Sequence, residues 1–159
     1  MQKRLRCLDV LLVVLCLLAN AKASAGIGIS YDQAMRHLSD KFSMKQVSPV
    51  GGAARFMGST SENLATIELI GSKSDIQQAT FMLGLPNDAP SVVRRNTLLL
   101  SRFLENIVPE WPSSDVWVAE STKKLVKRGE KISVIKGRKI IEIDFLQPLG
   151  IVVLSIREK

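Results

Sequence analysis

Cysteine is nearly absent from this sequence of 159 residues. Its two cysteines, Cys7 and Cys16, lie within the first 25 residues, so the rest of the chain can form neither a disulfide nor a thiolate metal site. The sequence contains one histidine, His37. One imidazole without a cysteine or a second histidine does not make an ordinary zinc or haem site. We therefore expect no metal and no cofactor.

Motifs that name an enzyme activity are also missing. Gly26-Ile27-Gly28 resembles the start of a dinucleotide-binding loop, but it lacks the third glycine and a preceding strand. Residues 121–124 match the Ser-x-x-Lys pattern of penicillin-recognising enzymes, in which the lysine helps to deprotonate the serine. The other motifs of those enzymes are absent, and Ser121 falls inside a predicted helix. A small residue facing the core is the favoured interpretation of Ser121.

The first 25 residues have the pattern of a secretory signal peptide. Basic residues come first, an apolar run follows over residues 10–19, and small residues at 21, 23 and 25 offer cleavage after Ala23 or Ala25. The run is about half the length that a membrane-spanning helix needs, which disfavours a retained anchor. Leu15 before Cys16 disfavours lipid attachment. We expect an exported protein, periplasmic or extracellular, with residues 26–159 as one globular domain that is not an integral membrane protein.

The positive charge of the chain is concentrated in one stretch. The sequence has 22 basic and 15 acidic residues, and without residues 1–25, which hold four basic and one acidic residue, 18 and 14 remain. That mild excess does not indicate nucleic-acid binding. Residues 123–139 contain eight basic residues against Glu130 alone, with no aromatic residue among them to stack on bases. The eight are Lys123, Lys124, Lys127, Arg128, Lys131, Lys136, Arg138 and Lys139.

Such a stretch has two interpretations. It is either a solvated face or a surface that contacts anionic lipids, acidic glycans or an acidic protein. Lys123, Lys124, Lys127 and Arg128 are the candidate partner-binding cations.

Capping signals and apolar spacing predict four helices. Ser30 and Gln33 form a capping box before a helix over residues 31–42, and the same pattern at residues 74–77 predicts a second helix ending near Gly84. A third helix is predicted from about Pro90 to the residues before Pro109. A fourth is predicted over residues 114–128, followed by Gly129 as a left-handed cap.

Alternating or continuous apolar runs predict six strands, over residues 45–50, 53–58, 64–70, 132–135, 140–146 and 151–156. Their short connections make neighbouring strands antiparallel. The predicted fold is α+β, with an antiparallel sheet of about six strands and helices packed on one face. The order of elements also hints at an internal duplication of a helix-plus-three-strand unit.

Three features are candidates for function. Glu142 and Asp144 share one face of a predicted strand, which is either a carboxylate pair for hydrolysis or a wet surface where they pair with Lys131 or Arg157. Asn96 falls on the apolar stripe of the third helix, so it needs a hydrogen-bond partner in the turn at residues 85–88 or in a ligand pocket.

The third feature is a pair of tryptophans. Trp117 is expected in the core, and Trp111, between two prolines, either anchors its loop or belongs to a contact surface. Taken together, these features favour a small exported, non-enzymatic binding or accessory protein of the bacterial envelope. Its partner would be a protein or an anionic envelope surface. The alternative is a small secreted hydrolase that uses the strand carboxylates.

Overall fold

The structure is a computed structural model that describes residues 26–86 and 90–159, apart from the side chains of Val126 and Arg128. The predicted signal peptide therefore lies outside the described residues. Seven strands form one antiparallel sheet, and three helices accompany it. The strands are β1 (Lys45–Val50), β2 (Ala53–Ser59), β3 (Ala65–Gly71), β4 (Ile76–Gly84), β5 (Ile132–Lys136), β6 (Lys139–Leu146) and β7 (Ile151–Glu158). The helices are α2 (Tyr31–Ala34), α3 (Pro90–Ile107) and α4 (Ser114–Arg128), with a 3-10 turn, η1 (Gln147–Leu149), before β7.

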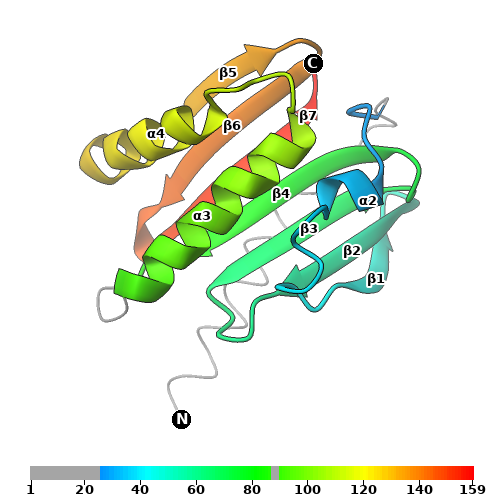
Figure 1. The fold of residues 1–159 in the computed structure, drawn as a ribbon, viewed down its shortest axis with the longest axis horizontal. Helices are drawn as coiled ribbons and strands as arrows, with labels where there is room; N and C mark the ends of the chain where they lie inside the picture. The colour runs from blue at the N-terminus through cyan, green and yellow to red at the C-terminus, as the bar shows by residue number, and fades with distance from the viewer. Residues whose placement is uncertain (1–25, 87–89) are drawn as a thin grey trace.

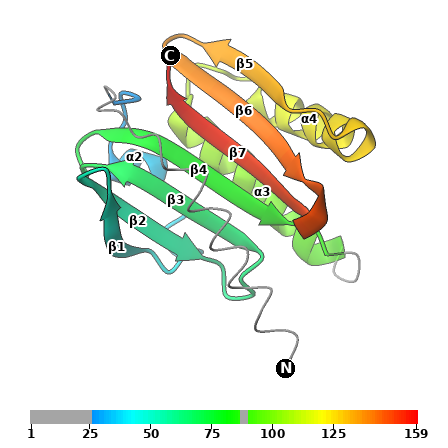
Figure 2. The same ribbon diagram turned by 180° about the vertical axis from the view of Figure 1, so that it is seen from behind.

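The strand order β1-β2-β3-β4-β7-β6-β5 joins two antiparallel meanders. Strands β1 to β4 follow one another along the chain, α3 and α4 come next, and β5 to β7 return so that β7 pairs with β4. Figures 1 and 2 show α2, α3 and α4 on the same side of the sheet. The predicted α+β class is confirmed, with one strand more than expected. The internal duplication stays a prediction, and the first meander has one strand more than the second.

The extra strand is β4, where we predicted a helix, and that prediction was wrong. Apolar residues at helical spacing suggested a helix over residues 74–83, but the segment is a strand whose residues from Ala79 to Leu83 are all buried, so both of its faces are covered. Phe81 is fully buried and lies opposite Ile67 of β3 and Leu154 of β7. Ser74, the predicted capping residue, lies in the turn between β3 and β4, where its hydroxyl is 3.0 Å from that of Ser72 and the N–H of Asp75 donates to the Oγ of Ser72 at 3.0 Å. A strand that is buried on both faces loses the alternation that identifies it in a sequence.

The helix predicted over residues 31–42 was wrong in length, because α2 ends at Ala34. The Oγ of Ser30 accepts from the N–H of Gln33 at 3.2 Å, as predicted. The side chain of Gln33 does not return to Ser30 but donates to the carbonyl of Asn106 of α3 at 3.4 Å. His37 has a φ of +59°, which a right-handed helix does not allow. The apolar side chains that suggested a longer helix are buried all the same: Met35, Leu38 and Phe42.

The other predicted elements are confirmed to within about two residues at each end. Helix α3 covers the expected range, and α4 has the predicted bounds, with Asp115 in its first turn. Gly129 follows α4 in the left-handed conformation, and its N–H donates to the carbonyl of Leu125 at 2.8 Å. β1 and β2 pair antiparallel across the short turn at Gly51-Gly52, as their short connection predicted.

The core lies between the helices and the sheet. The Phe81 ring of β4 is 5.6 Å from that of Phe103 on α3 and 5.8 Å from that of Phe42, measured between ring centroids. All three side chains are buried, and burying a side chain of this size stabilises a fold by about 2 to 3 kcal/mol. These contacts fix α3 across the middle of the sheet.

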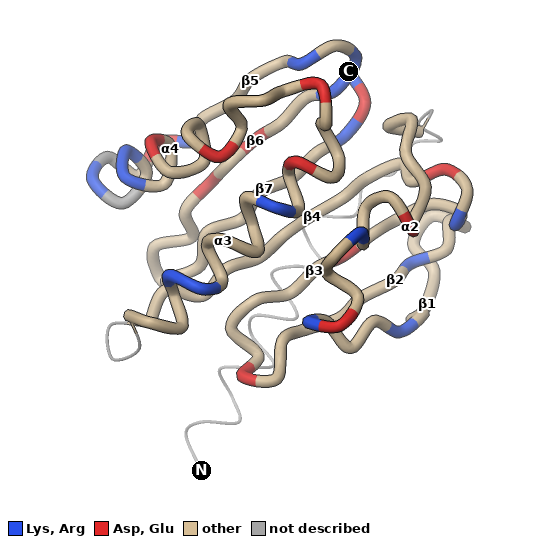
Figure 3. The backbone as a smooth tube through the Cα atoms, viewed as in Figure 1, with Lys and Arg blue, Asp and Glu red and all other residues tan. Residues whose placement is uncertain are grey.

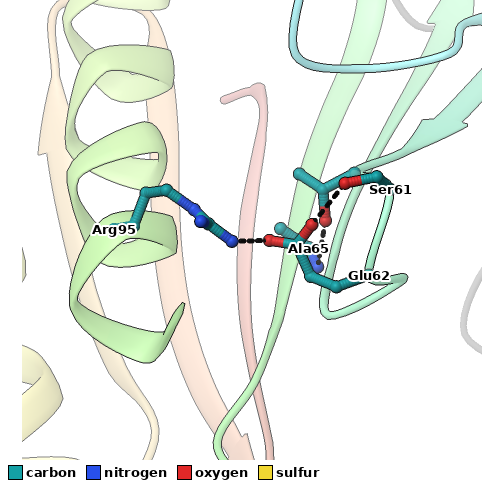
Figure 4. Close-up of polar contacts among 5 residues, drawn as sticks. Ser61, Glu62, Ala65 and Arg95 are labelled. Atoms are coloured by element: carbon teal, nitrogen blue, oxygen red, sulfur yellow. Dashed lines mark hydrogen bonds and ion pairs between the residues drawn. The ribbon is translucent and has the colours of Figure 1, made fainter. Parts of the chain in front are cut away.

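A polar contact at the surface also holds α3. Arg95 of α3 forms an ion pair with Glu62, which lies in the turn between β2 and β3 (Figure 4). The hydroxyl of Ser61 donates to the Glu62 carboxylate at 2.7 Å, and the N–H of Ala65 donates to the Oγ1 of Thr60 in the same turn. The Ser61 hydroxyl, the backbone and Arg95 together hold the pKa of Glu62 below its usual range. The turn is thereby tied to the first half of α3.

Candidate partner-binding surface

Half of the basic residues in the stretch 123–139 are engaged within the fold. Lys131 lies 3.2 Å from Glu142, and Lys139 lies 3.4 Å from Glu110 while donating to the carbonyl of Ile107 at 2.7 Å. Arg138 forms an ion pair with Glu158. The Nζ of Lys136 lies 4.4 Å from the ring centroid of Trp111. These four cations stabilise the β5–β6 hairpin and its attachment to the end of α3.

Three lysines of α4 have no such role. Lys123, Lys124 and Lys127 are exposed, and no acidic side chain of the described residues lies within ion-pair distance of them. Figure 3 shows basic residues gathered at the C-terminal end of α4. We call Lys123, Lys124 and Lys127 the α4 lysine patch. The side chain of Arg128, the fourth predicted binding residue here, lies outside the described residues.

Burial of the opposite side of α4 explains why the patch faces outward. Val118 and Leu125 are fully buried and Ser121 nearly so, which places the three on the side of α4 that contacts the core. The lysines are one or two positions away in the sequence and therefore point away from that side. Ser121 thus lies in the core-facing row, as its favoured interpretation had it. The amphipathic pattern of α4 positions the patch.

The two tryptophans lie together beside the paired cations. Trp111 and Trp117 have ring centroids 5.2 Å apart, and both side chains are partly buried against the core. Trp117 was expected inside the core, but it is only half-buried and packs against the core from outside. Trp111 packs on Trp117 and carries Lys136 above its ring. Trp111 is partly buried, so the anchoring of its loop and a role in a contact surface both stay predictions.

Asn96 belongs to α3 and is not part of this surface. Its side chain is fully buried, and neither Oδ1 nor Nδ2 has a hydrogen-bond partner among the described residues. We predicted that a buried amide at this position would find one, in particular in the turn at residues 85–88, of which 87 and 88 lie outside the described residues. An unpartnered buried amide costs about 1 to 3 kcal/mol.

The strand carboxylates lie on the face of the sheet opposite the helices. Glu142 contacts Lys131 at 3.2 Å and Arg157 at 3.9 Å, the two partners expected for a wet strand surface. Asp144 accepts from the N–H of Phe145 at 2.7 Å. His37 is exposed in the turns after α2 and is not close in the fold to a metal-ligand set, since the described residues contain no group of three potential ligands. Within the described ranges, no helix has the length and hydropathy needed to cross a membrane.

A buried ion pair that was not predicted from the sequence lies on the same face of the sheet. The Nε of Arg55 in β2 lies 2.5 Å from the Oε1 of Glu68 in β3, and both side chains are buried. Burial raises the pKa of Glu68 above its usual value, and the neighbouring Arg55 guanidinium offsets part of that rise. The Oε2 of Glu68 has no hydrogen-bond partner among the described residues. Glu68 lies inside the apolar run at residues 64–70, and a carboxylate in such a run indicates a buried polar contact. Its partner, Arg55, is identified only by the strand register.

Comparison with protein-family models, with curated proteins and with solved structures found no match for this chain.

Proposed function

We propose that this protein is an exported, non-enzymatic binding domain of the bacterial envelope that contacts an anionic partner through the α4 lysine patch. The observation that carries the proposal is the unequal use of the cations in residues 123–139. Four of them are engaged by acidic or aromatic side chains, while the three of the patch have no ion-pair partner among the described residues. Cations without partners on one exposed helix side form a local field that attracts anions.

The expected strength of this contact is modest. Each lysine near an anionic surface contributes about 1 kcal/mol, and salt screens the attraction beyond about 8 Å at physiological ionic strength. Three lysines therefore support weak, salt-sensitive binding. The alternative, a hydrolase that uses Glu142 and Asp144, has less support because Glu142 is occupied by Lys131 and Arg157.

The test is co-sedimentation of the purified protein with anionic and with neutral lipid vesicles. The wild-type protein is expected to sediment with the anionic vesicles at low salt, and a Lys123→Glu, Lys124→Glu, Lys127→Glu variant is expected to stay in solution. Thermal unfolding of both proteins controls for folding, because exposed helix positions change stability little. Equal sedimentation of the two proteins would overturn the role of the patch.

A separate measurement tests export. Expression of the full sequence in a bacterium, followed by mass spectrometry of the protein recovered outside the cytoplasm, is expected to give Ser24 or Gly26 as the first residue. Recovery of the uncleaved chain in the cytoplasm alone would contradict this part of the proposal.

A further inference from the structure

The two edges of the sheet differ in how they are protected. At one edge, β1 is exposed along most of its length, contains Pro49 and has a register irregularity between Val47 and Val50. Proline and bulges are the usual devices that prevent an edge strand from pairing further. At the other edge, β5 pairs with β6 in continuous register and has neither device. Strand β5 is therefore the edge at which another strand can add.

The hairpin register fixes which backbone groups of β5 are open. Lys136 and Lys139 face each other across the two-residue turn at Gly137, whose φ of +58° suits the first central position of such a turn. The pair that closes such a turn is hydrogen-bonded, and hydrogen-bonded pairs alternate along an antiparallel ladder. Residues 132, 134 and 136 therefore bond to β6, and the N–H and C=O groups of Ser133 and Ile135 point outward.

The side chains around this edge suit a partner strand. Ile135 is 51% exposed, and Ile132 and Val134 are partly buried against the core. An added strand would cover these apolar groups while its backbone bonds to Ser133 and Ile135. Extended peptides bind sheet edges by this combination of backbone bonds and alternate side-chain contacts.

The charges around β5 select the occupant. Lys131 precedes the strand and Lys136 is its last residue. Helix α4, which contains the α4 lysine patch, comes just before β5 in the chain. A second copy pairing antiparallel with β5 would bring Lys131 of one chain towards Lys136 of the other, and like charges opposed across strands destabilise pairing. An acidic segment meets a lysine at each end of the strand, where Lys131 also contacts Glu142 and Lys136 also lies over the ring of Trp111.

We propose that β5 takes up an extended acidic segment of a partner protein as an eighth strand of the sheet. This inference rests on the proposed function and specifies the partner. The segment needs about five residues, since five residues of strand span about 17 Å. It gains up to four backbone hydrogen bonds from Ser133 and Ile135.

The experiment uses a fluorescent seven-residue peptide of alternating glutamate and valine, with affinity measured by anisotropy. Ser133→Pro removes an outward N–H without breaking the ladder to β6, and proline is tolerated on an edge strand where the N–H faces solvent. Ser133→Ala removes the hydroxyl but keeps the N–H and is the matched control. We expect Ser133→Pro to weaken peptide binding at least tenfold and Ser133→Ala to change it less than twofold. Equal binding by all three proteins would overturn the inference.

A second readout needs no variant. In the wild-type protein, saturation with the peptide is expected to slow amide hydrogen exchange at Ser133 and Ile135 at least tenfold, because their N–H groups become bonded. Unchanged exchange at both amides would overturn the inference even if Ser133→Pro failed to fold.

Two further probes separate this inference from the proposed function. One is a peptide with the same glutamates but proline in place of valine, and the other is an anionic lipid vesicle. If the proline peptide binds as well as the strand-forming peptide, the contact is electrostatic only, so the β5 inference fails and the proposed function stands. If no anionic probe binds, both fail.

Discussion

Asn96 and Asn106 are two asparagines of α3 with different surroundings. The Nδ2 of Asn106 donates to the carbonyls of Ala34 and Arg36 at 3.1 and 2.7 Å, which links α3 to α2 and the turn after it. The amide of Asn96 is fully buried, with no partner among the described residues. Asparagine should therefore stabilise the fold at position 106 and destabilise it at position 96.

Replacement of each asparagine by leucine tests this difference. Asn96→Leu keeps the branching at Cγ and removes the unpartnered amide, so it is expected to raise the free energy of unfolding by about 1 kcal/mol. Asn106→Leu loses two hydrogen bonds and is expected to lower it by about 1 to 2 kcal/mol. Denaturant unfolding of the two variants and the wild type measures both changes. A loss of stability in Asn96→Leu as large as that in Asn106→Leu would show that the Asn96 amide is paired.

The Arg55–Glu68 pair leads to a prediction about both charge removal and pH. Glu68→Leu leaves the buried Arg55 cation without its partner and is expected to cost about 3 kcal/mol. Arg55→Met combined with Glu68→Leu removes both charges and is expected to be at least as stable as the wild type at neutral pH. Urea unfolding of the three proteins provides the comparison. A double variant that is less stable than Glu68→Leu alone would contradict this account.

The pH dependence follows from the raised pKa of Glu68. The folded protein takes up a proton on this carboxyl at a higher pH than the unfolded chain, whose ordinary value is 4.5. The contribution of Glu68 to stability is therefore most favourable below that value and is lost as the pH rises through the folded pKa. We expect the advantage of the double variant over the wild type to shrink as the pH falls from neutral towards 4.5. An advantage that grows in acid would show that the pKa is lowered instead.

Among the elements, the turn from β3 into β4 depends on Gly71. Its φ is +131°, and a Cβ there would lie 2.5 Å from the carbonyl oxygen of Asp75. Gly52, in the turn between β1 and β2, also has a positive φ, of +82°, but a Cβ there would meet nothing within 4 Å. The two glycines share a backbone restriction and differ in available space.

We expect Gly71→Ala to lower the free energy of unfolding by at least about 2 kcal/mol, because backbone strain and a collision with the backbone add together. Gly52→Ala is expected to cost about 1 kcal/mol, from strain alone. Thermal unfolding followed by circular dichroism compares the two variants with the wild type. Equal losses would mean that the turn at Gly71 relaxes to admit a side chain.

Most elements could be predicted from the sequence because local signals and tertiary packing agree there. Helix α4 has an acidic first turn, lysines near its end and Gly129 after it, and its predicted bounds are those observed. The β5–β6 hairpin was equally accessible from its apolar runs and Gly137. Strand β4 was not, since its residues are buried on both faces from Ala79 to Leu83, which leaves no alternation to detect. Pairing with β3 and β7 makes this segment a strand, although its local pattern favours a helix.

The candidate site shows a similar division. The sequence locates the cations of residues 123–139 but does not distinguish engaged from free ones. That distinction depends on Glu142, Glu158 and Glu110, which come from other elements, and on the ring of Trp111. The partners of Glu142 were the exception, because neighbouring strands made Lys131 and Arg157 reasonable candidates. Because four of the eight cations contact side chains from other elements, only the three lysines of the α4 lysine patch are left without such contacts among the described residues.

For the whole molecule, the arrangement separates stability from surface chemistry. The core between α3 and the centre of the sheet contains the buried aromatic residues, while the α4 lysine patch and the β5 edge lie at one end of the sheet. Charge changes in the patch should therefore alter binding and leave folding intact. Net charge alone should not reproduce the effect, because the attraction acts within about 8 Å of the lysines.

The most direct test of the proposed function compares two variants with the same net charge. One is Lys123→Glu, Lys124→Glu, Lys127→Glu, and the other is Lys41→Glu, Lys45→Glu, Lys73→Glu, which changes exposed lysines in the first half of the chain. Binding to anionic vesicles is measured across a salt series. We predict that the second variant binds nearly as well as the wild type and with the same salt dependence, while the first does not bind above its level on neutral vesicles. Equal loss in the two variants would contradict the account, because binding would then follow total charge and not the α4 lysine patch.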